Sequence, residues 1–332
     1  MDESALIAQL FAPLAKGAAG AFSLTDDAAQ LPIENPNVTN AALIAGVHFR
    51  KEDPLDLVAM KALRVNLSDI AAMGARPVGY VLACAWPRAT SAQDIAQFAR
   101  GLSEDQRRYD IALYGGDTTA HADERAPLVG SVTMFGDAPR EGVVRRDGAR
   151  PGDDLYVTGV IGYAGLGLAA LDRRMDFDLD AAVPAVDRYL APRPRLAMGR
   201  ALARIASAML DVSDGLLKDA GRLAAASAVD VEIDAGAIQV SPLAAAWLAR
   251  ESDPWRARAQ LAAFGDDYEL LFAASPARRA AVEAAAAASE TPVARIGRVR
   301  ERRNLDVSLT LFLDPDGRAI EGPSSGYDHF AR

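Results

Sequence analysis

Aspartates recur in this chain inside segments that are otherwise apolar or rich in Gly and Ser. The segments are Thr25-Asp26-Asp27, Leu67-Ser68-Asp69, Gly115-Gly116-Asp117-Thr118-Thr119, Asp211-Val212-Ser213-Asp214-Gly215 and Gly265-Asp266-Asp267-Tyr268-Glu269. Each lies where a helix or strand is expected to begin or end. Because Asp and Ser are common helix caps, any one of these motifs alone favours a structural role. Their number in one chain favours a shared function.

The surroundings of two of these aspartates favour metal binding. Asn66 and Asp69 lie three residues apart on a predicted helix that is otherwise apolar, and an ionised carboxylate there is costly unless it is paired or bound to metal. Asp211 ends an apolar run and is followed closely by Asp214. Hard oxygen ligands in this number suit Mg²⁺, which keeps waters and bridges to substrate phosphates. The sequence therefore favours a magnesium site over a set of surface caps.

Phosphate binding is the matching expectation for the glycines. Gly115-Gly116 before Asp117 is expected to let backbone N–H groups approach a phosphate, with the aspartate reaching its metal. A P-loop is excluded because the chain has no Gly-x-x-x-x-Gly-Lys-Ser/Thr sequence. The segment 159–167 is rich in glycine, but its spacing differs from a dinucleotide fingerprint and predicts a tight turn and helix start. Arg145 and Arg146 could donate to phosphate, and solvated surface charge is an equal alternative.

The histidines and the cysteine point away from zinc and disulfide chemistry. His48, His121 and His329 stand far apart and lack cysteine partners, which argues against a zinc site. His48 follows a glycine closely, so it could line a pocket or be a satisfied core histidine. Cys84 is the single cysteine, which excludes an internal disulfide, and its apolar strand-like setting predicts core packing.

The composition limits the partners. The chain has 332 residues, with 36 Lys and Arg against 45 Asp and Glu, a net charge of −9. No basic block suggests nucleic-acid binding, so an anionic ligand must be held locally, by metal or a few arginines. The N-terminus lacks a signal-peptide pattern, and no stretch is long enough to cross a bilayer. We therefore expect a cytoplasmic protein without a membrane partner.

Short apolar runs alternate with helical patterns along the chain, which predicts a mixed α/β (α+β) fold. A Gly-, Pro- and Arg-rich stretch at 136–154 predicts the boundary between an N-terminal domain, residues 1–138, and a C-terminal domain, residues 139–332. The predicted helices are 54–74, 91–108, 195–207 and 276–288. The predicted strands are 78–85, 111–114, 128–135, 155–158, 229–233 and 268–273. Ser91 and Asp94 form the capping box of the second helix.

In this order, the motifs resemble those of the thiamine-monophosphate kinase family. Its superfamily includes aminoimidazole-ribonucleotide synthetase, selenophosphate synthetase and a hydrogenase maturation protein. The resemblance covers nearly the whole chain. It rests on Thr25–Ala29, Gly46–Phe49, Lys61–Ala75, Gly115–Thr118, Gly148–Asp153, Asp211–Leu216, Asp267–Leu270 and Gly326–Phe330. The long segment that ends at Ala75 and the two His-Phe motifs are specific to the family, whereas the shorter Asp motifs indicate only the superfamily.

The resemblance implies a two-domain aminoimidazole-ribonucleotide synthetase-like fold. Its N-terminal domain would form a sheet that binds ATP and Mg²⁺ and mediates a homodimer, and its C-terminal domain would be α/β. The implied activity is transfer of the ATP γ-phosphoryl group to thiamine monophosphate, a phosphate acceptor, which gives thiamine diphosphate and ADP. This transfer would occur by direct in-line displacement without a phosphoenzyme, a reaction that needs mainly positioning and charge neutralisation.

The resemblance also implies residue roles. The implied Mg²⁺ ligands are Asp27, Thr39, Asn40, Asp69, Asp117, Asp211 and Asp214. Of these, Asp69, Asp117 and Asp214 would act in catalysis. The implied ATP contacts are Gly116, Asp117, Arg146 and Ser213. The implied substrate contacts are His48, Asp266, Ser324 and Tyr327.

Three positions depart from the family pattern. Ala41 stands where the family has a metal-binding aspartate, and a methyl group cannot bind Mg²⁺, so the neighbouring Asn40 amide is expected to compensate in part. Ser324 stands where some members have a tryptophan, and Tyr327 or another aromatic side chain could replace it. Asp266 replaces the more usual glutamate and keeps its charge.

Two rival functions remain open. One is another ATP-dependent enzyme of the same superfamily with a different acceptor, which would lack the His-Phe motifs. The other is a catalytically weakened protein that binds nucleotide or thiamine phosphate, and Ala41 motivates it.

Overall fold

The chain folds into two compact units. The structure, a computed structural model, describes residues 3–24, 28–140, 142–175, 177–304, 306–321 and 326. The N-terminal unit comprises Met1–Ile70 and Ala75–Glu141, and the C-terminal unit comprises Ala71–Gly74 and Gly142–Arg332. Each unit combines helices with a β-sheet, which confirms the predicted α/β (α+β) class.

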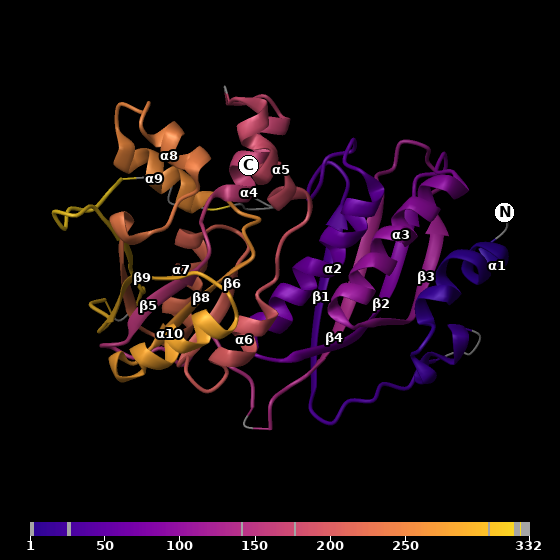
Figure 1. Cartoon of the computed structure of the whole chain (residues 1–332), viewed down its shortest axis with the longest axis horizontal. Helices are drawn as coiled ribbons and strands as arrows, with labels where there is room; N and C mark the ends of the chain where they lie inside the picture. The colour runs from indigo at the N-terminus through magenta and orange to yellow at the C-terminus, as the bar shows by residue number, and fades with distance from the viewer. Residues whose placement is uncertain are drawn as a thin grey trace. The chain divides into compact units, whose positions relative to one another are not determined.

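The N-terminal unit has one sheet with two long helices over one of its faces (Figure 1). At the β3 edge, Ala15, Ala18 and Ala21 pack against Tyr114 and Val81. Its helical elements are α1 (Glu3–Leu6), η1 (Ile7–Phe11), η2 (Ala12–Ala15), η3 (Ala19–Leu24), α2 (Leu55–Ala72) and α3 (Ala92–Tyr109). Its strands are β1 (Pro36–Ile44), β2 (Arg76–Trp86), β3 (Ala112–Ala120) and β4 (Val129–Asp137). The strand order is β1-β4-β2-β3, in which β2 and β3 are parallel and the other pairs antiparallel. Strands β1 and β3 are therefore the two edges.

The sequence predicted α2 and α3 correctly because both carry strong local signals. At α3, the Ser91 hydroxyl accepts from the Asp94 N–H and the Asp94 carboxylate accepts from the Ser91 N–H, as a capping box requires. A buried ion pair joins the two helices, since Arg64 Nε and Nη2 each donate to Asp105 over 2.7 Å. The helix that carries Asp69 is thus anchored to its neighbour as well as to the sheet.

Strand β3 is longer than the sequence predicted. The expected strand ended at Tyr114, before a glycine turn, whereas β3 continues through Gly115, Gly116 and Asp117. Gly116 pairs with Leu82 of β2, and a Cβ at this position would collide with the Leu82 carbonyl oxygen. The absence of a side chain therefore permits close strand packing here, so the expected strand end at Tyr114 was wrong. The approach of these backbone N–H groups to a phosphate stays a prediction.

The C-terminal unit has a six-stranded sheet. Its helical elements are α4 (Tyr163–Leu171), α5 (Leu179–Leu190), α6 (Leu196–Leu202), α7 (Leu216–Ser227), η4 (Ala235–Ala237), α8 (Pro242–Leu248), α9 (Pro254–Ala263), η5 (Pro276–Arg278) and α10 (Arg279–Ala288). Its strands are β5 (Asp154–Thr158), β6 (Ala208–Val212), β7 (Asp230–Asp234), β8 (Glu269–Ala274), β9 (Val293–Arg300) and β10 (Thr310–Leu313). The strand order is β10-β7-β9-β5-β8-β6, and all neighbours except β10 and β7 are antiparallel.

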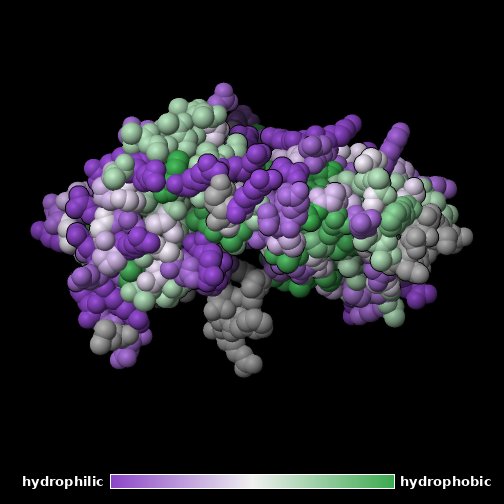
Figure 2. Space-filling model, turned by 90° about the horizontal axis from the view of Figure 1, so that it is seen from below, coloured by the Kyte–Doolittle hydropathy of each residue, from purple (hydrophilic) through white to green (hydrophobic). Residues whose placement is uncertain are grey.

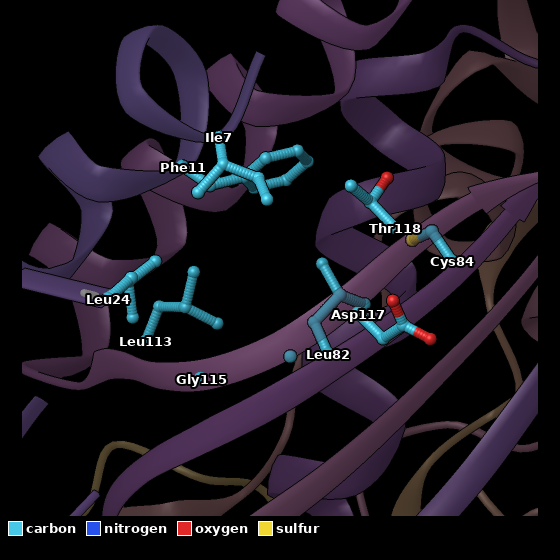
Figure 3. Close-up of a pocket in the computed structure, with 10 residues that line it drawn as sticks. Ile7, Phe11, Leu24, Leu82, Cys84, Leu113, Gly115, Asp117 and Thr118 are labelled. Carbon is cyan, nitrogen blue, oxygen red and sulfur yellow. The ribbon is translucent and has the colours of Figure 1, made fainter. Parts of the chain in front are cut away.

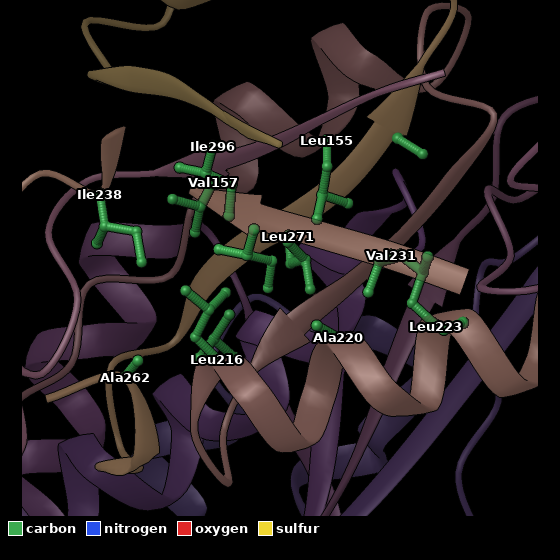
Figure 4. Close-up of a cluster of buried hydrophobic side chains, with 14 of the residues drawn as sticks. Leu155, Val157, Leu216, Ala220, Leu223, Val231, Ile238, Ala262, Leu271 and Ile296 are labelled. Atoms are coloured by element: carbon green, nitrogen blue, oxygen red, sulfur yellow. The ribbon is translucent and has the colours of Figure 1, made fainter. Parts of the chain in front are cut away.

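The main core of this unit lies between α7 and the sheet. Leu216 and Leu223 of α7 face Val157, Leu271 and other fully buried side chains of the strands (Figure 4). Burying each such aliphatic side chain stabilises the fold by about 1.5–3 kcal/mol. This core fixes the loop between β6 and α7, which carries several predicted site residues.

One further prediction is confirmed in this unit, and another is wrong. The glycine-rich segment 159–167 is a turn followed by α4, as expected: Gly162 has φ +76° and α4 begins at Tyr163. The predicted helix 195–207 is too long, because α6 ends at Leu202. Ser207 instead donates its backbone N–H to Ala273 of β8 over 2.8 Å, which starts the pairing of β6. Tertiary strand pairing overrode helical propensity there.

Within the described ranges, no helix has the length and apolar character that spanning a membrane requires. Figure 2 shows hydrophobic residues reaching the surface of the N-terminal unit, in the right half of that view, among hydrophilic ones.

Candidate functional site

Thr39 and Asp69 lie together in the N-terminal unit. The Thr39 hydroxyl on β1 donates to Asp69 Oδ2 on α2 over 2.6 Å. Both side chains are half-buried, and Thr39 pairs in register with the buried Met134 of β4. Thr39 therefore faces the helices, and the pair offers hard oxygen atoms on the helix-covered side of the sheet.

Asn40 and Ala41, the next two residues of β1, point to opposite faces of the sheet because side chains alternate along a strand. Ala41 points to the same face as Thr39, and its register partner Val132 is fully buried. Asn40 points to the opposite, exposed face, where its Nδ2 donates to Ser131 Oγ, Val132 O and Thr133 Oγ1 over 2.9–3.1 Å. Asn40 therefore cannot supply an amide oxygen beside Thr39 and Asp69, which corrects the expectation that it compensates for Ala41 there.

Asp117 lies at the other edge of the same sheet. It pairs in register with the exposed Ala83 of β2, so it shares the uncovered sheet face with Asn40. Between β1 and β3 lie β4 and β2, so three strand spacings of about 4.8 Å, roughly 14 Å in all, separate the edges. Among the described residues, no group of three His, Cys, Asp or Glu side chains is arranged to hold a metal ion. The candidate ligands described in this unit therefore lie apart, with Thr39 and Asp69 together and Asp117 separate from them.

A pocket adjoins Gly116 and Asp117 (Figure 3). Its volume is about 100 Å³, and one wall is formed by Ile7, Phe11 and Leu24 of the N-terminal helical segment. The opposite wall is formed by β2 and β3, with the lining residues Leu82, Cys84, Leu113, Gly115, Gly116, Asp117 and Thr118. A mostly apolar lining with a few polar groups at one side is shared with small-molecule sites, although this cavity is smaller than the roughly 300–1,000 Å³ of such sites.

Cys84 lines this pocket but is a core residue, as predicted. Its thiol is free and 3% exposed, and burial raises its pKa to about 12. A thiol with such a pKa carries almost no thiolate at neutral pH and is a poor nucleophile.

His48 is held by the turn that follows β1. Its Nδ1 accepts the Ile44 backbone N–H over 3.0 Å, and its carbonyl oxygen accepts from the buried Lys61 Nζ over 3.0 Å. Because Nδ1 is an acceptor, the neutral ring carries its proton on Nε2. The His48 side chain is half-buried.

In the C-terminal unit the fold brings Asp266 close to the segment that carries Asp211, Ser213 and Asp214. Asp211 is the next-to-last residue of β6, and Ser213 and Asp214 follow in the loop before α7. Asp266 approaches this loop, since its N–H donates to the Ser213 carbonyl over 2.9 Å. Gly326 lies beside the Asp214 carbonyl, where a Cβ would collide.

Asp214 is ion-paired within this loop. Its carboxylate contacts Lys218 Nζ at 3.1 Å and also Arg222. The buried Asp219 accepts the N–H groups of Ser213 and Asp214, each over 3.0 Å, and pairs with Arg222. Burial raises the pKa of Asp219, and the Arg222 charge opposes that rise. Asp219, which the sequence did not single out, therefore shapes the loop that presents Ser213 and Asp214.

Two acidic residues of the Gly265–Glu269 segment have structural roles. Asp267 accepts the N–H groups of Gly162 and Ala164 and so caps α4. Burial raises the pKa of Asp267 to about 8, although those two hydrogen bonds favour the charged form. Glu269 is fully buried and pairs with Arg188 and Arg195.

The other predicted residues are exposed or lie outside the described residues. Arg146 is exposed, and its carbonyl oxygen accepts from Ser227 Oγ over 2.9 Å. Its side chain has no hydrogen bond or ion pair to the described part of the chain. Asp27, Ser324 and Tyr327 lie outside the described residues.

The sequence reasoning missed the pocket and its helical wall. Ile7 and Phe11 are four residues apart, the spacing of one helical face, and this was the available signal. The pocket itself depends on how η1 and η3 pack against β3, which the sequence pattern does not encode locally.

Comparison with known proteins places these motifs in a family. Residues 25–138 match the AIR synthase related protein N-terminal domain, and residues 150–310 match the AIR synthase related protein C-terminal domain. Thiamine-monophosphate kinase of Caulobacter vibrioides is 44% identical over 295 residues, which cover 88% of this chain and 82% of that protein.

Solved structures agree with this assignment. The crystal structure of thiamine-monophosphate kinase from Stenotrophomonas maltophilia is 38% identical, with a TM-score of 0.77 over 89% of this chain and 90% of that chain. The structure of AaThiL complexed with AMPPCP and TMP is 27% identical, with a TM-score of 0.75 over 92% of this chain and 91% of that one. This chain has both AIR synthase related domains and is similar to these kinases along most of its length. It therefore belongs to the thiamine-monophosphate kinase family.

Proposed function

We propose that this chain transfers the γ-phosphoryl group of ATP to thiamine monophosphate, which gives thiamine diphosphate and ADP. The similarity along most of both chains to a structure complexed with AMPPCP and TMP carries this proposal. The geometry of the chain supports it, because an apolar pocket adjoins Gly116 and Asp117, the residues expected to contact ATP. Direct in-line transfer is the mechanism that needs only positioning and charge neutralisation.

The nucleotide is proposed to bind at the pocket of the N-terminal unit. Ile7, Phe11 and Leu24 present apolar surface suited to a flat base, and Asp117 lies at the polar side. Ser213 and Arg146 are the contacts proposed for the C-terminal unit. The side chain of Arg146 suits phosphate recognition, because a guanidinium can donate two parallel hydrogen bonds to phosphate oxygens.

The donor atoms fit Mg²⁺ as its family implies. Mg²⁺ usually takes one or two carboxylates and completes its shell with waters and substrate phosphates. Asp69 with the Thr39 hydroxyl at 2.6 Å provides such a partial set, and Asp117, Asp211 and Asp214 are further proposed ligands, with Asp69, Asp117 and Asp214 acting in catalysis. When bound, the metal neutralises phosphate charge and aligns the reacting groups.

The acceptor is proposed to contact His48 and Asp266. The hydrogen bond from the Ile44 N–H to Nδ1 fixes the orientation of the His48 ring on the turn that follows β1. Asp266 has φ +68°, a strained conformation for a residue other than glycine, and it lies next to the loop of Ser213. Such strain often occurs at functional positions.

We also propose a homodimer through the uncovered face of the N-terminal sheet. This face carries Val38, which is 61% exposed, together with Ala42 and Ala83, beside the polar side chains of Asn40 and Asp117. Exposed apolar surface of this kind marks association sites. Val38→Asp should shift the protein from dimer to monomer in sedimentation velocity, and an unchanged dimer would remove this face from consideration.

A cytoplasmic location completes the proposal. It is supported by Cys84, a free and buried thiol of the kind that persists under reducing conditions.

One assay tests the activity. Purified protein with Mg²⁺, ATP and thiamine monophosphate should form thiamine diphosphate and ADP in equal amounts, measured by chromatography, and thiamine should be a poor acceptor. Equal ADP release without thiamine monophosphate would indicate an ATP-dependent enzyme with another acceptor. No ADP release, together with calorimetric binding of AMPPCP, would indicate a nucleotide-binding protein that has lost its activity.

A further inference from the structure

Among the described residues that line the pocket, Thr118 is the one with a hydroxyl side chain. Figure 3 shows its side chain near Asp117 and Cys84, with Phe11 on the opposite wall. Thr118 pairs in register with Cys84, so it points to the helix-covered side of the sheet, whereas Asp117 points to the uncovered side. A ligand in the pocket therefore meets the Thr118 hydroxyl from the helix side.

The direction of the hydrogen bond at this hydroxyl is fixed. Trp86 Nε1 lies 2.9 Å from Thr118 Oγ1, and an indole N–H can only donate. The threonine oxygen is therefore the acceptor in this contact. A hydroxyl has one O–H to donate, and for Thr118 no acceptor of that proton occurs among the described residues. The O–H is left to donate to a group in the pocket.

Trp86 is held firmly behind Thr118. It is 3% exposed, does not line the pocket itself, and packs edge-on against Phe98 with ring centroids 5.3 Å apart. Its backbone carbonyl also accepts the His121 N–H over 2.8 Å. An indole fixed in this way holds the threonine oxygen in one orientation before any ligand binds, which reduces the entropy lost on binding.

We propose that Thr118 is a nucleotide-binding residue that donates a hydrogen bond to an acceptor atom of bound ATP, and that Trp86 is the residue that orients it. This inference rests on the proposed nucleotide site. The acceptor is a ring nitrogen or an oxygen of the nucleotide, since the proton that Thr118 offers has no other partner in the described pocket. Trp86 acts only through Thr118.

Calorimetric titration with AMPPCP and Mg²⁺ tests the first part. Thr118→Val keeps the shape but removes the hydroxyl, and the dissociation constant should rise about fivefold, the effect of one lost hydrogen bond. Thr118→Ser keeps the hydroxyl and should remain within about twofold of the original protein. In turnover assays Thr118→Val should raise the KM for ATP and leave the KM for thiamine monophosphate unchanged. Equal AMPPCP affinity of Thr118→Val and the original protein would overturn the proposal.

A double-mutant cycle tests the second part. Trp86→Phe removes the indole N–H and should weaken AMPPCP binding about twofold to threefold, whereas Trp86→Phe in the Thr118→Val background should have no further effect. Fully additive losses would show that Trp86 does not act through Thr118. If Trp86→Phe fails to fold, the Val and Ser variants at Thr118 still decide whether the hydroxyl donates.

These measurements separate the inference from the proposed function. AMPPCP binding by the original protein without formation of thiamine diphosphate would contradict the kinase activity but leave the role of Thr118 testable. No AMPPCP binding at all would overturn the nucleotide site and this inference together.

Discussion

The carboxylates of the two units differ in what surrounds them. In the N-terminal unit, Asp69 accepts from a threonine hydroxyl, and Asp117 is exposed on an edge strand without an ion pair to any described residue. In the C-terminal unit, Glu269 is enclosed by two arginines and Asp267 by two backbone N–H groups. Similar Asp- and Glu-containing motifs thus serve either as candidate ligands or as internal supports.

This difference teaches that a carboxylate near a site is informative only with its partners. Asp214 shows the intermediate case, since it is a proposed ligand and also contacts Lys218 and Arg222. A cation that binds at Asp214 competes with these two side chains, whereas one contact of Asp69 is the neutral hydroxyl of Thr39. We therefore expect substitutions of the candidate ligands, such as Asp69, to change activity. Substitutions of the enclosed carboxylates Asp267 and Glu269 should change stability.

The largest expected effect is at Asp69. Asp69→Asn keeps the size and the oxygen that accepts from Thr39 but removes the charge, so turnover should fall at least about 100-fold because metal-dependent charge stabilisation supplies several kcal/mol. Turnover of thiamine monophosphate with ATP at saturating Mg²⁺ measures this. The free energy of unfolding in urea should stay within about 0.5 kcal/mol. Normal turnover would remove Asp69 from the site.

Glu269 should show the opposite behaviour. Glu269→Gln leaves the guanidinium groups of Arg188 and Arg195 without their buried counter-charge, so the free energy of unfolding should fall by about 3–5 kcal/mol. Glu232→Gln, which breaks an exposed pair with Arg300 in the same sheet, is the control and should cost less than about 1 kcal/mol. Equal losses in urea denaturation would contradict the difference between buried and exposed carboxylates.

Substitution of Ala41 tests whether the candidate metal site at Thr39 and Asp69 lacks a ligand. Ala41→Asp adds a carboxylate on the face that carries Thr39, so the Mg²⁺ concentration for half-maximal activity should fall about tenfold. Ala41→Asn adds a side chain of the same size without charge and should have little effect. If both variants respond to Mg²⁺ as the original protein does, the alanine is not the cause of weaker metal binding.

The smallest expected effect is the pH dependence that Asp267 gives to the free energy of unfolding. Its pKa is about 8 in the folded chain and about 3.9 when unfolded, so between these values the folded state holds a proton that the unfolded state lacks. The stabilisation that protonated Asp267 contributes is therefore fully present below about pH 4, and it is lost as the pH rises through about 8. The free energy of unfolding should fall by about 1 kcal/mol from pH 6 to 7 relative to Asp267→Asn. Parallel pH profiles for the two proteins would show that the carboxyl is ionised throughout.

Much of the fold was predictable because its signals are local. The capping box at Ser91 and Asp94 predicted α3, and the apolar run around Leu155 predicted β5. The end of β3 and the end of α6 were wrong because pairing with β2 and β8, which are distant in sequence, decided them. Local propensity carries no information about such pairing.

The sequence by itself determined the family, through a specific order of motifs, and the two mixed α/β domains. The tertiary structure alone decided which carboxylates are enclosed, since Glu269 finds its arginine partner 81 residues away. It also decided that Asn40 and Ala41 face opposite ways and that Trp86 lies behind Thr118. The physical reason is that charge pairing, strand face and hydrogen-bond direction depend on neighbours that only the folded chain brings together.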